Sequence, residues 1–206
     1  MTVVRTASST DAQNLLGSGG RLLRMSHEMV LDLNEHPWSP AVSISDQLRL
    51  QDIDRPPPEI AAAAGAATPA GHSDHETWAS VDRPAYWADV LSGRLTGPIL
   101  TEASRLLVDP SGRVAGALAV TAMAGSDWWP GGPWVTEMFV VPTLQNRGLG
   151  RRLLAHAAAA CAGAGYKRLG LTVTDGNAAE RLYRRVGFKR FRTVWAIETR
   201  DENGGK

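Results

Sequence analysis

The chain has 206 residues, of which 43% are hydrophobic, and its formal net charge is +1 at pH 7. This length and apolar fraction suit one large globular domain, or one domain with an extension, whereas so small a charge excludes the strong basic excess typical of nucleic-acid-binding proteins. The single cysteine, Cys161, excludes an internal disulfide and favours a cytoplasmic location. No apolar run is long enough to cross a bilayer, and residues 1–6 lack the apolar stretch of a secretory signal, so we expect no membrane partner.

The first half of the chain combines irregular and structured segments. Residues 1–45 are predicted to be an extension, in which the apolar residues of the segment 22–33 form a short helix or an arm packed on the main domain. Residues 48–53 alternate apolar and polar side chains, which predicts a first strand. A proline-rich break then precedes a short helix, an alanine- and glycine-rich surface loop over residues 61–76, and a second helix over residues 84–91.

The second half of the chain alternates predicted strands and helices. Residues 105–108 and 114–120 flank an Asp-Pro-Ser-Gly segment with type I turn chemistry, which predicts a hairpin. The next elements in order are a strand over 134–141, a helix over 151–164, a buried strand over 169–173, a helix that Asn177 caps, and a closing strand or hairpin over 188–198. Three antiparallel strands therefore precede the first helix of this half.

A glycine-containing turn, Gln145-Asn146-Arg147-Gly148-Leu149-Gly150, lies between the third of these strands and that helix. Its two glycines can adopt positive φ and let an anion approach the backbone closely. The unpaired N–H groups of the first helical turn and the helix dipole favour negative charge at the same place. Three arginines add full positive charges: Arg147, Arg151 and Arg152. A segment of this kind is typical of a pyrophosphate site, although Gly-x-Gly alone is common at helix starts.

Three patterns then occur in a fixed order: a strand ending in Val140-Val141-Pro142, the motif Gln145-x-x-Gly148-x-Gly150 at a helix start, and Asn177, Ala179 and Leu182-Tyr183 followed by Gly187-Phe188. This combination, over about residues 134–188, resembles the GNAT superfamily of acyl-CoA-dependent N-acetyltransferases. The resemblance implies an α/β (α+β) fold with a mixed, mostly antiparallel sheet of roughly six to seven strands, flanked by helices and splayed at its centre. It also implies a GNAT domain over residues 46–200, with an N-terminal extension over 1–45 and a short tail over 201–206.

The resemblance implies acetyl-CoA as the co-substrate and no metal. In the family, the pantetheine arm lies between the splayed strands, and a bulge in the first of them frees backbone groups for the cofactor. Carried over to this chain, the cofactor-binding residues are Phe139, Val140 and Val141 beside the pantetheine, Gln145, Asn146, Arg147, Gly148, Leu149, Gly150 and Arg151 around the pyrophosphate, and Asn177 near the pantetheine arm. We expect a backbone N–H near Phe139 or Val140 to bind the oxyanion, which is worth about 10²–10³ in rate.

Two side chains are candidate catalysts on the same resemblance. Tyr183, near the sulfur, would be the general acid that protonates the departing thiolate, a contribution of about 10²–10⁴ in rate; the alternative is a structural tyrosine packed on the inner face of its helix. Glu137 would be the general base, directly or through water, because burial in a cleft raises the pKa of a carboxyl group; the alternative is a solvated carboxylate at a strand edge. In many relatives a water chain replaces a single base.

The segment His72-Ser73-Asp74-His75-Glu76 has two interpretations. Its histidines and carboxylates are types of zinc ligand, but no cysteine or further histidine cluster supports a metal, and a polar loop explains the segment equally well. The resemblance implies that this loop helps to form the acceptor pocket, with contacts from His72, Asp74, His75, Glu76 and Trp78. Three further tryptophans are expected in core or loop packing: Trp128, Trp129 and Trp134.

The predicted function is transfer of an acetyl group from acetyl-CoA to a primary amine of an unidentified acceptor, by direct attack in a ternary complex. The acceptor is a small molecule or a peptide or protein amine, and we expect no nucleic-acid partner. The alternative is a non-catalytic acyl-CoA-binding or regulatory domain, since a fold does not fix a function. A P-loop or dinucleotide site is disfavoured, because the turn lacks a Gly-Lys-Ser/Thr ending and follows antiparallel strands. Homodimers are common in the family, and the sequence leaves this point open.

Overall fold

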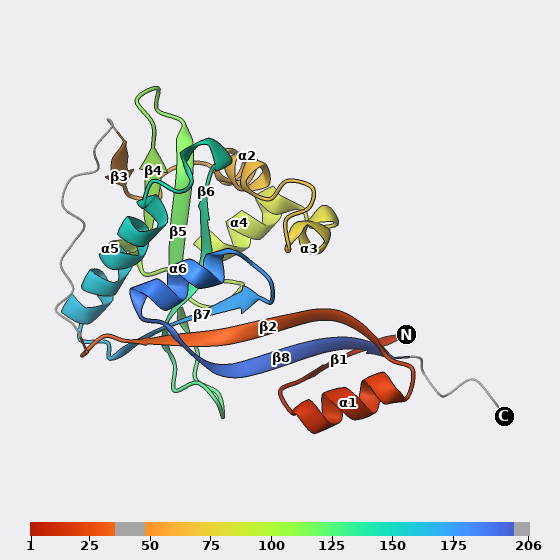
Figure 1. Cartoon of the computed structure of the whole chain (residues 1–206). Helices are drawn as coiled ribbons and strands as arrows, with labels where there is room; N and C mark the ends of the chain where they lie inside the picture. The colour runs from red at the N-terminus through yellow and green to blue at the C-terminus, as the bar shows by residue number, and fades with distance from the viewer. Residues whose placement is uncertain (36–47, 200–206) are drawn as a thin grey trace.

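The computed structural model describes residues 1–35 and 48–199. Within these residues, eight strands form one sheet in the order β1-β8-β2-β7-β6-β5-β4-β3 (Figure 1). The strands are β1 (Thr2–Thr6), β2 (Arg21–Asp32), β3 (Arg49–Gln51), β4 (Arg105–Val108), β5 (Val114–Met123), β6 (Gly132–Val140), β7 (Arg168–Thr174) and β8 (Lys189–Thr199). All neighbouring strands are antiparallel except β6 and β7, which are parallel. The predicted fold class, a mixed and mostly antiparallel sheet, is confirmed.

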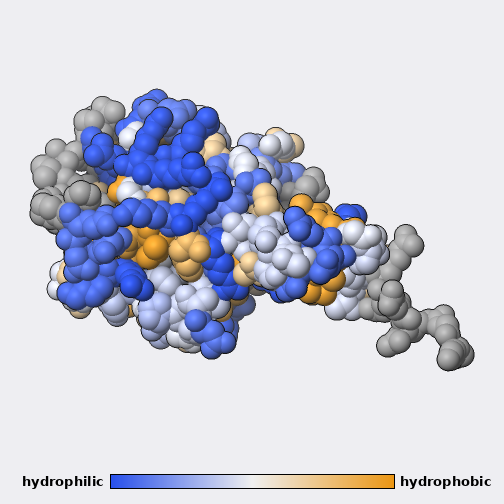
Figure 2. Space-filling view, turned by 60° about the horizontal axis from the view of Figure 1, so that its bottom comes forward, coloured by the Kyte–Doolittle hydropathy of each residue, from blue (hydrophilic) through white to orange (hydrophobic). Residues whose placement is uncertain are grey.

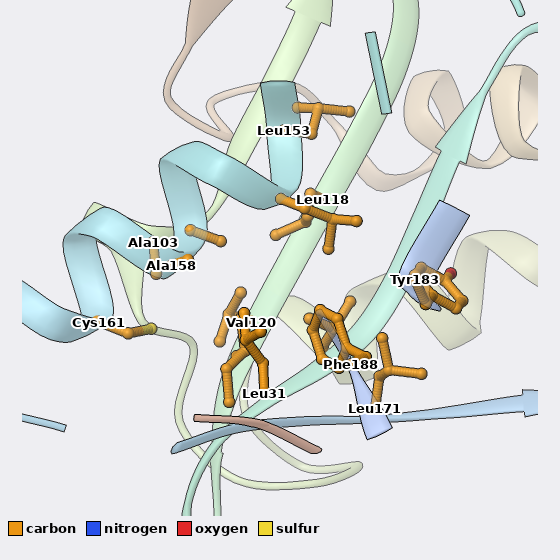
Figure 3. Close-up of a cluster of buried hydrophobic side chains, with 14 of the residues drawn as sticks. Leu31, Ala103, Leu118, Val120, Leu153, Ala158, Cys161, Leu171, Tyr183 and Phe188 are labelled. Atoms are coloured by element: carbon orange, nitrogen blue, oxygen red, sulfur yellow. The ribbon is translucent and has the colours of Figure 1, made fainter. Parts of the chain in front are cut away.

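Helices cover both faces of the β4–β6 part of the sheet (Figure 1). The helices of the described residues are α1 (Ser9–Gly17), which lies against β1 and β8, α2 (Pro57–Ala67), α3 (His75–Ala79), α4 (Arg83–Leu91), α5 (Leu149–Gly163) and α6 (Ala179–Val186), with single 3-10 turns at Thr101–Ala103 and Pro142–Leu144. Strand β5 serves two cores because its side chains alternate between the faces. Ala117 and Ala119 pack under α2 and α4, whereas Leu118 and Val120 belong to the cluster under α5 that Figure 3 shows.

The N-terminal segment contributes a strand to the middle of the sheet. β2 lies between β7 and β8 and pairs with both of them. Met29, Leu31 and Leu33 are buried, and their spacing follows the two-residue period of a strand. The prediction of a helix or an arm over residues 22–33 is therefore wrong, and the sheet extends into the predicted N-terminal extension. The predicted boundary at residues 45 and 46 and the predicted tail over residues 201–206 lie outside the described residues.

The other predicted elements lie close to their expected positions, with one exception. The strand over 48–53 is β3, and the predicted hairpin is formed by β4 and β5. The cap of α6 is confirmed, because the Asn177 side-chain oxygen accepts a hydrogen bond from the Ala179 N–H at 2.8 Å. The exception is the segment 61–67, which is predicted as a loop but continues α2. Alanine is the strongest helix former, and Ala61 and Ala67 are buried on the inner side of α2.

Apolar side chains are exposed at the N-terminal end of the sheet. Figure 2 shows hydrophobic residues gathered on the narrow part of the molecule, at the right of the view. The large hydrophobic residues exposed in this segment are Met1, Val3, Leu16, Leu22 and Leu23. This end of the sheet carries the short helix α1 on one side, so the apolar side chains of β1 and β2 are only partly covered.

Candidate active site

A cavity of about 960 Å³ opens where β6 and β7 separate. The parallel pairing of these strands is limited to Trp134 with Gly170 and Val135 with Leu171. Just beyond that point, the register of β6 on β5 shifts, which leaves Thr136 as an extra, bulged residue. The next residues of β6, from Glu137 to Val140, and residues 171–174 of β7 line opposite sides of the cavity. The predicted splayed strands and the bulge are therefore present, because two strands that no longer pair leave room between them.

The glycine turn closes one end of this cavity. Gly148 caps α5 in a left-handed conformation, with φ of 75°, and Asn146 also has a positive φ of 62°. A Cβ atom added at Gly148 would meet no atom within 4 Å, so the backbone there is open to a ligand. The first N–H groups of α5 have no acceptor inside the helix and point towards the same space. The turn thus forms the anion-binding arrangement that the sequence predicts.

Other residues of the turn have structural roles. The Gln145 side-chain N–H donates to the Val140 carbonyl at 2.9 Å and fastens the turn to the end of β6. A Cβ added at Gly150 would lie 2.9 Å from the ends of the Leu182 and Met138 side chains, which would have to shift to make room. Gly150 therefore permits α6 and β6 to pack closely against the start of α5.

The arginines near the turn divide between two hollows. Arg151, Arg181 and Arg185 line the main cavity, and among the described residues none of these three forms an ion pair. Arg147 lines a second hollow of about 730 Å³ beside α2, together with Val141. Arg147 and Val141, both predicted to bind the cofactor, thus lie outside the lining of the main cavity, whereas α6 supplies two arginines that the sequence analysis did not single out.

Glu137 is partly buried and is hydrogen-bonded to a tyrosine from α4. The Tyr86 hydroxyl donates to the Glu137 Oε1 at 2.6 Å. Desolvation raises the pKa of Glu137 to about 7, against the lowering effect of the Tyr86 hydrogen bond; the Asp74 charge raises it further, and Arg24 and Arg83 lower it. Burial, and then the Glu137 charge, raise the pKa of Tyr86 well above its usual value. Glu137 is therefore a carboxyl group that exchanges a proton near neutral pH.

Tyr183 lies at the edge of the core cluster under α5 and also lines the cavity (Figure 3). Its ring contacts Phe188 edge-on, with centroids 5.9 Å apart, so the packing role that the sequence leaves open is real. Burial is the main cause that raises the pKa of its hydroxyl, followed by the negative charges of Glu137 and Asp74. The hydroxyl therefore stays protonated at neutral pH, as a proton donor must.

Asp74 links the loop before α3 to the far side of the cavity. It accepts hydrogen bonds from the Thr174 hydroxyl and, at 2.9 Å, from the Asn177 side-chain amide. The Asn177 side-chain oxygen caps α6. The oxygen and the amide nitrogen of Asn177, which is predicted to contact the cofactor, are therefore both hydrogen-bonded within the protein. Arg24 of β2 joins the group, since its Nη2 donates to the Thr174 hydroxyl at 2.6 Å.

Only some side chains of the loop predicted to face the acceptor line the cavity. His72, Asp74 and Trp78 line the cavity, whereas the His75 ring is bonded to the Thr68 carbonyl oxygen at 3.1 Å. The Glu76 side chain lies outside the described part of the structure. No group of three metal-ligating side chains occurs among the residues that the structure describes, and no helix of that part has the length and hydropathy to cross a membrane.

The three tryptophans of the β5–β6 region mostly pack against one another. Trp129 and Trp134 are buried with ring centroids 4.9 Å apart, and Trp128 stacks on Phe191 and contacts Trp134 edge-on. Trp134 also lines the cavity. The prediction of packing roles is thus confirmed, with one of the three also forming a wall of the site.

Two side chains that line the cavity, Arg24 and Tyr86, could not have been placed there from the sequence. Arg24 reaches the site only because β2 is inserted beside β7, and Tyr86 only because α4 packs over Glu137. Neither residue belongs to a local motif. Both positions depend on contacts between distant segments of the chain.

Comparisons with known proteins agree with this geometry. Residues 98–190 match the family model described as acetyltransferase (GNAT) domain, and no curated protein matches the chain. A GCN5-related N-acetyltransferase from Sphaerobacter thermophilus has a TM-score of 0.69 at 20% identity, over 95% of this chain and 59% of its own length. A GCN5-related N-acetyltransferase from Kribbella flavida has a TM-score of 0.59 at 17% identity, over 98% of this chain and 68% of its own length.

A tandem GNAT protein from the clavulanic acid biosynthesis pathway is also similar, with a TM-score of 0.62 at 16% identity, over 99% of this chain and 64% of its own length. This chain therefore spans less than two thirds of that protein and of the Sphaerobacter protein. At these identities the solved structures show the shared fold, and the family match covers the glycine turn, the splayed strands and α6. Residues 98–190 therefore match a GNAT acetyltransferase domain, and the described residues share the fold of GCN5-related N-acetyltransferases.

Proposed function

We propose that this protein transfers an acetyl group from acetyl-CoA to a primary amine by direct attack in a ternary complex. The observation that carries the proposal is the cavity that joins the glycine turn of α5 to Glu137 and Tyr183 between the separated strands. One end offers backbone N–H groups to an anion, and the other offers groups that can exchange protons. Donor and acceptor can therefore occupy one space, as a direct transfer requires.

The turn fits the diphosphate of coenzyme A. The open backbone at Gly148 and the N-terminal end of α5 favour a negatively charged group. Three arginines that line the same cavity would add charge-assisted hydrogen bonds: Arg151, Arg181 and Arg185. Bound acetyl-CoA would supply an activated thioester, so the residues of the protein need only position the amine and move protons.

Two side chains would move these protons. With a pKa of about 7, Glu137 is partly ionised at neutral pH and would take a proton from the acceptor amine, directly or through a water molecule. Tyr183, whose hydroxyl remains protonated, would give its proton to the departing sulfur. A backbone N–H group at the bulge of Thr136 would bind the oxyanion, because Phe139 and Val140, the positions predicted for this role, pair in register with β5.

The proposal is tested by measuring free-thiol release from acetyl-CoA with a panel of primary amines, alongside direct measurement of acetyl-CoA binding. Amine-dependent thiol release supports the proposal. Tight acetyl-CoA binding that no amine converts into thiol release supports the non-catalytic alternative instead.

The location of the cofactor is tested with Gly148→Trp, which should abolish acetyl-CoA binding by filling the open space at the turn. The matched control is Gly165→Trp. Gly165 also has a positive φ, of 85°, and an open Cβ position, but it lies beyond the opposite end of α5. Both variants carry the same backbone strain, so only occupation of the turn distinguishes them. Normal binding by Gly148→Trp would contradict the diphosphate assignment.

A further inference from the structure

Two arginines and one alanine lie in a row across the N-terminal end of the sheet. Arg5 of β1 and Arg24 of β2 both pair with Ala196 of β8, from its two sides. Residues directly opposite in antiparallel strands project to the same face, so the two guanidinium groups share a face with only a methyl group between them. Neighbouring strands lie about 4.8 Å apart, which places the two Cα atoms about 10 Å apart. We call Arg5 and Arg24 the arginine pair.

The arginine pair lies on the face of the sheet that borders the cavity. On the opposite face, which α1 covers (Figure 1), Val4 lies opposite the fully buried Ile197. Both arginines line the cavity, together with Asp74 and Glu137. The cavity thus extends from the separated strands to the N-terminal part of the sheet, where its lining includes these two cationic side chains.

The positive charge of the arginine pair is only partly balanced within the protein. Arg5 is exposed and forms no ion pair within residues 1–35 and 48–199. Arg24 donates hydrogen bonds to the neutral Thr174 hydroxyl, and its Nη2 is 3.8 Å from an Asp74 oxygen, beyond hydrogen-bond distance. The Asp74 carboxylate already accepts hydrogen bonds from Thr174 and Asn177. A negatively charged group entering the cavity would therefore find unused N–H donors at the arginine pair.

Two carboxyl groups, those of Asp74 and Glu137, line the same cavity. Asp74 and Glu137 are close enough for the charge of one to raise the pKa of the other, and Arg24 acts on Glu137 in the opposite sense. The cavity therefore presents both cationic and carboxyl groups to an acceptor. This combination matches a molecule with an anionic group at one end and an amino group at the other.

We propose that the acceptor is an amine that also carries a carboxylate, with the arginine pair binding the carboxylate and the amino group directed to Glu137. This inference rests on the proposed function and names the acceptor class of the same site. Guanidinium groups present paired N–H donors that match the two oxygens of a carboxylate. β1 and β2 thereby become part of the acceptor site.

The test compares amines that differ only by the carboxylate: β-alanine with n-propylamine, and lysine with cadaverine. For each pair, kcat/KM with saturating acetyl-CoA is measured for the wild type, Arg5→Gln, Arg24→Gln and the control Arg94→Gln. Arg94 is an exposed arginine paired with Asp89 outside the cavity. We expect the wild type to favour the carboxylated member of each pair. A hydrogen-bonded charge contact is typically worth about ten- to hundredfold, so each cavity substitution should reduce kcat/KM for the carboxylated amine by about that factor relative to its partner, through KM.

The outcomes separate this inference from the proposed function. Equal use of both members of each pair by the wild type, or equal losses for both members in the variants, overturns the arginine pair as a carboxylate site while acetyl transfer stands. A stronger preference for O-phosphoethanolamine than for β-alanine overturns the carboxylate in favour of a phosphate.

If acetyl-CoA binds and no amine releases thiol, the proposed function fails, and the same pairs are compared by calorimetric binding in the presence of CoA. Equal affinities of the two members then overturn the inference as well. Because Arg5 is exposed on an edge strand, Arg5→Gln keeps the test valid even if Arg24→Gln disturbs folding.

Discussion

Replacement of Tyr86 by phenylalanine gives the most direct test of Glu137 as the base. The Tyr86 hydroxyl donates to Glu137 at 2.6 Å, and this hydrogen bond stabilises the ionised carboxylate and lowers its pKa. Tyr86→Phe keeps the aromatic ring, which contacts Trp78 edge-on, and removes only the donor. The pKa of Glu137 should therefore rise above its value of about 7.

The size of the effect follows from the energy of the lost hydrogen bond. A hydrogen bond to a charged group is typically worth about 1.5–3 kcal/mol, and one pKa unit corresponds to about 1.4 kcal/mol. Because Glu137 is only partly buried and water can replace part of the donor, we take the lower end, a rise of about one unit. At neutral pH the ionised fraction then falls from about one half to about one tenth, so kcat/KM should fall about fivefold.

The assay is kcat/KM for thiol release as a function of pH, expressed as the ratio of variant to wild type with one acceptor, so that ionisation of the amine itself cancels. The ratio should be lowest below neutral pH. It should approach one at about two pH units above the wild-type pKa, where Glu137 is ionised in both the variant and the wild type. The control is Tyr166→Phe, since Tyr166 packs against the core cluster outside the cavity. An unchanged profile, or a loss of equal size at every pH, would refute the assignment of Glu137 as the base held by Tyr86.

Three further predictions concern the same site. Folding raises the pKa of Glu137 from 4.5 to about 7, so the protonated carboxyl group stabilises the folded state fully below about pH 4.5, and this stabilisation is lost as the pH rises through about 7. Between about pH 5 and pH 8 the free energy of unfolding of Glu137→Gln should therefore increase by about 1–2 kcal/mol relative to that of the wild type. Denaturant unfolding of both proteins at the two pH values measures this difference. Tyr183→Phe should lower turnover by about 10² while the dissociation constant of acetyl-CoA stays nearly constant, and unchanged turnover would remove Tyr183 as the acid. Gly170→Ala should destabilise the protein by about 1–3 kcal/mol, because an added Cβ would collide with the Trp134 ring where β6 and β7 still pair. The control Gly163→Ala meets no neighbour, and equal unfolding free energies for the two variants would contradict the close contact.

The best-predicted parts of the site are those that depend on local conformation. The turn before α5 needs a residue with positive φ at Gly148, and the start of α6 needs the Asn177 cap; both requirements act within a few residues and leave a readable pattern. The strand that carries Glu137 is also predictable from its own residues. These local features made the turn and the cap predictable, whereas the fold class followed from the resemblance of the combined motifs to the GNAT superfamily.

The assignments that failed, or could not be made, depend on pairing between distant segments. Residues 22–33 have the spacing of a strand, but nothing in the sequence shows that they fill the place between β7 and β8. Tyr86 lies 51 positions from Glu137 along the chain, and Arg24 lies 150 positions from Thr174, so their contacts follow from packing of whole elements.

The sequence by itself therefore determined the glycine turn and the capped start of α6, because a turn, a helix start and a cap are specified by neighbouring residues. Tertiary structure alone decided the opposite part of the cavity. The tuning of Glu137 by Tyr86, the engagement of Asn177 with Asp74, and the arginine pair beside the cavity each require segments that meet only when the sheet is assembled. Strand pairing and helix packing are non-local, and a single sequence carries no direct record of which segments they bring together.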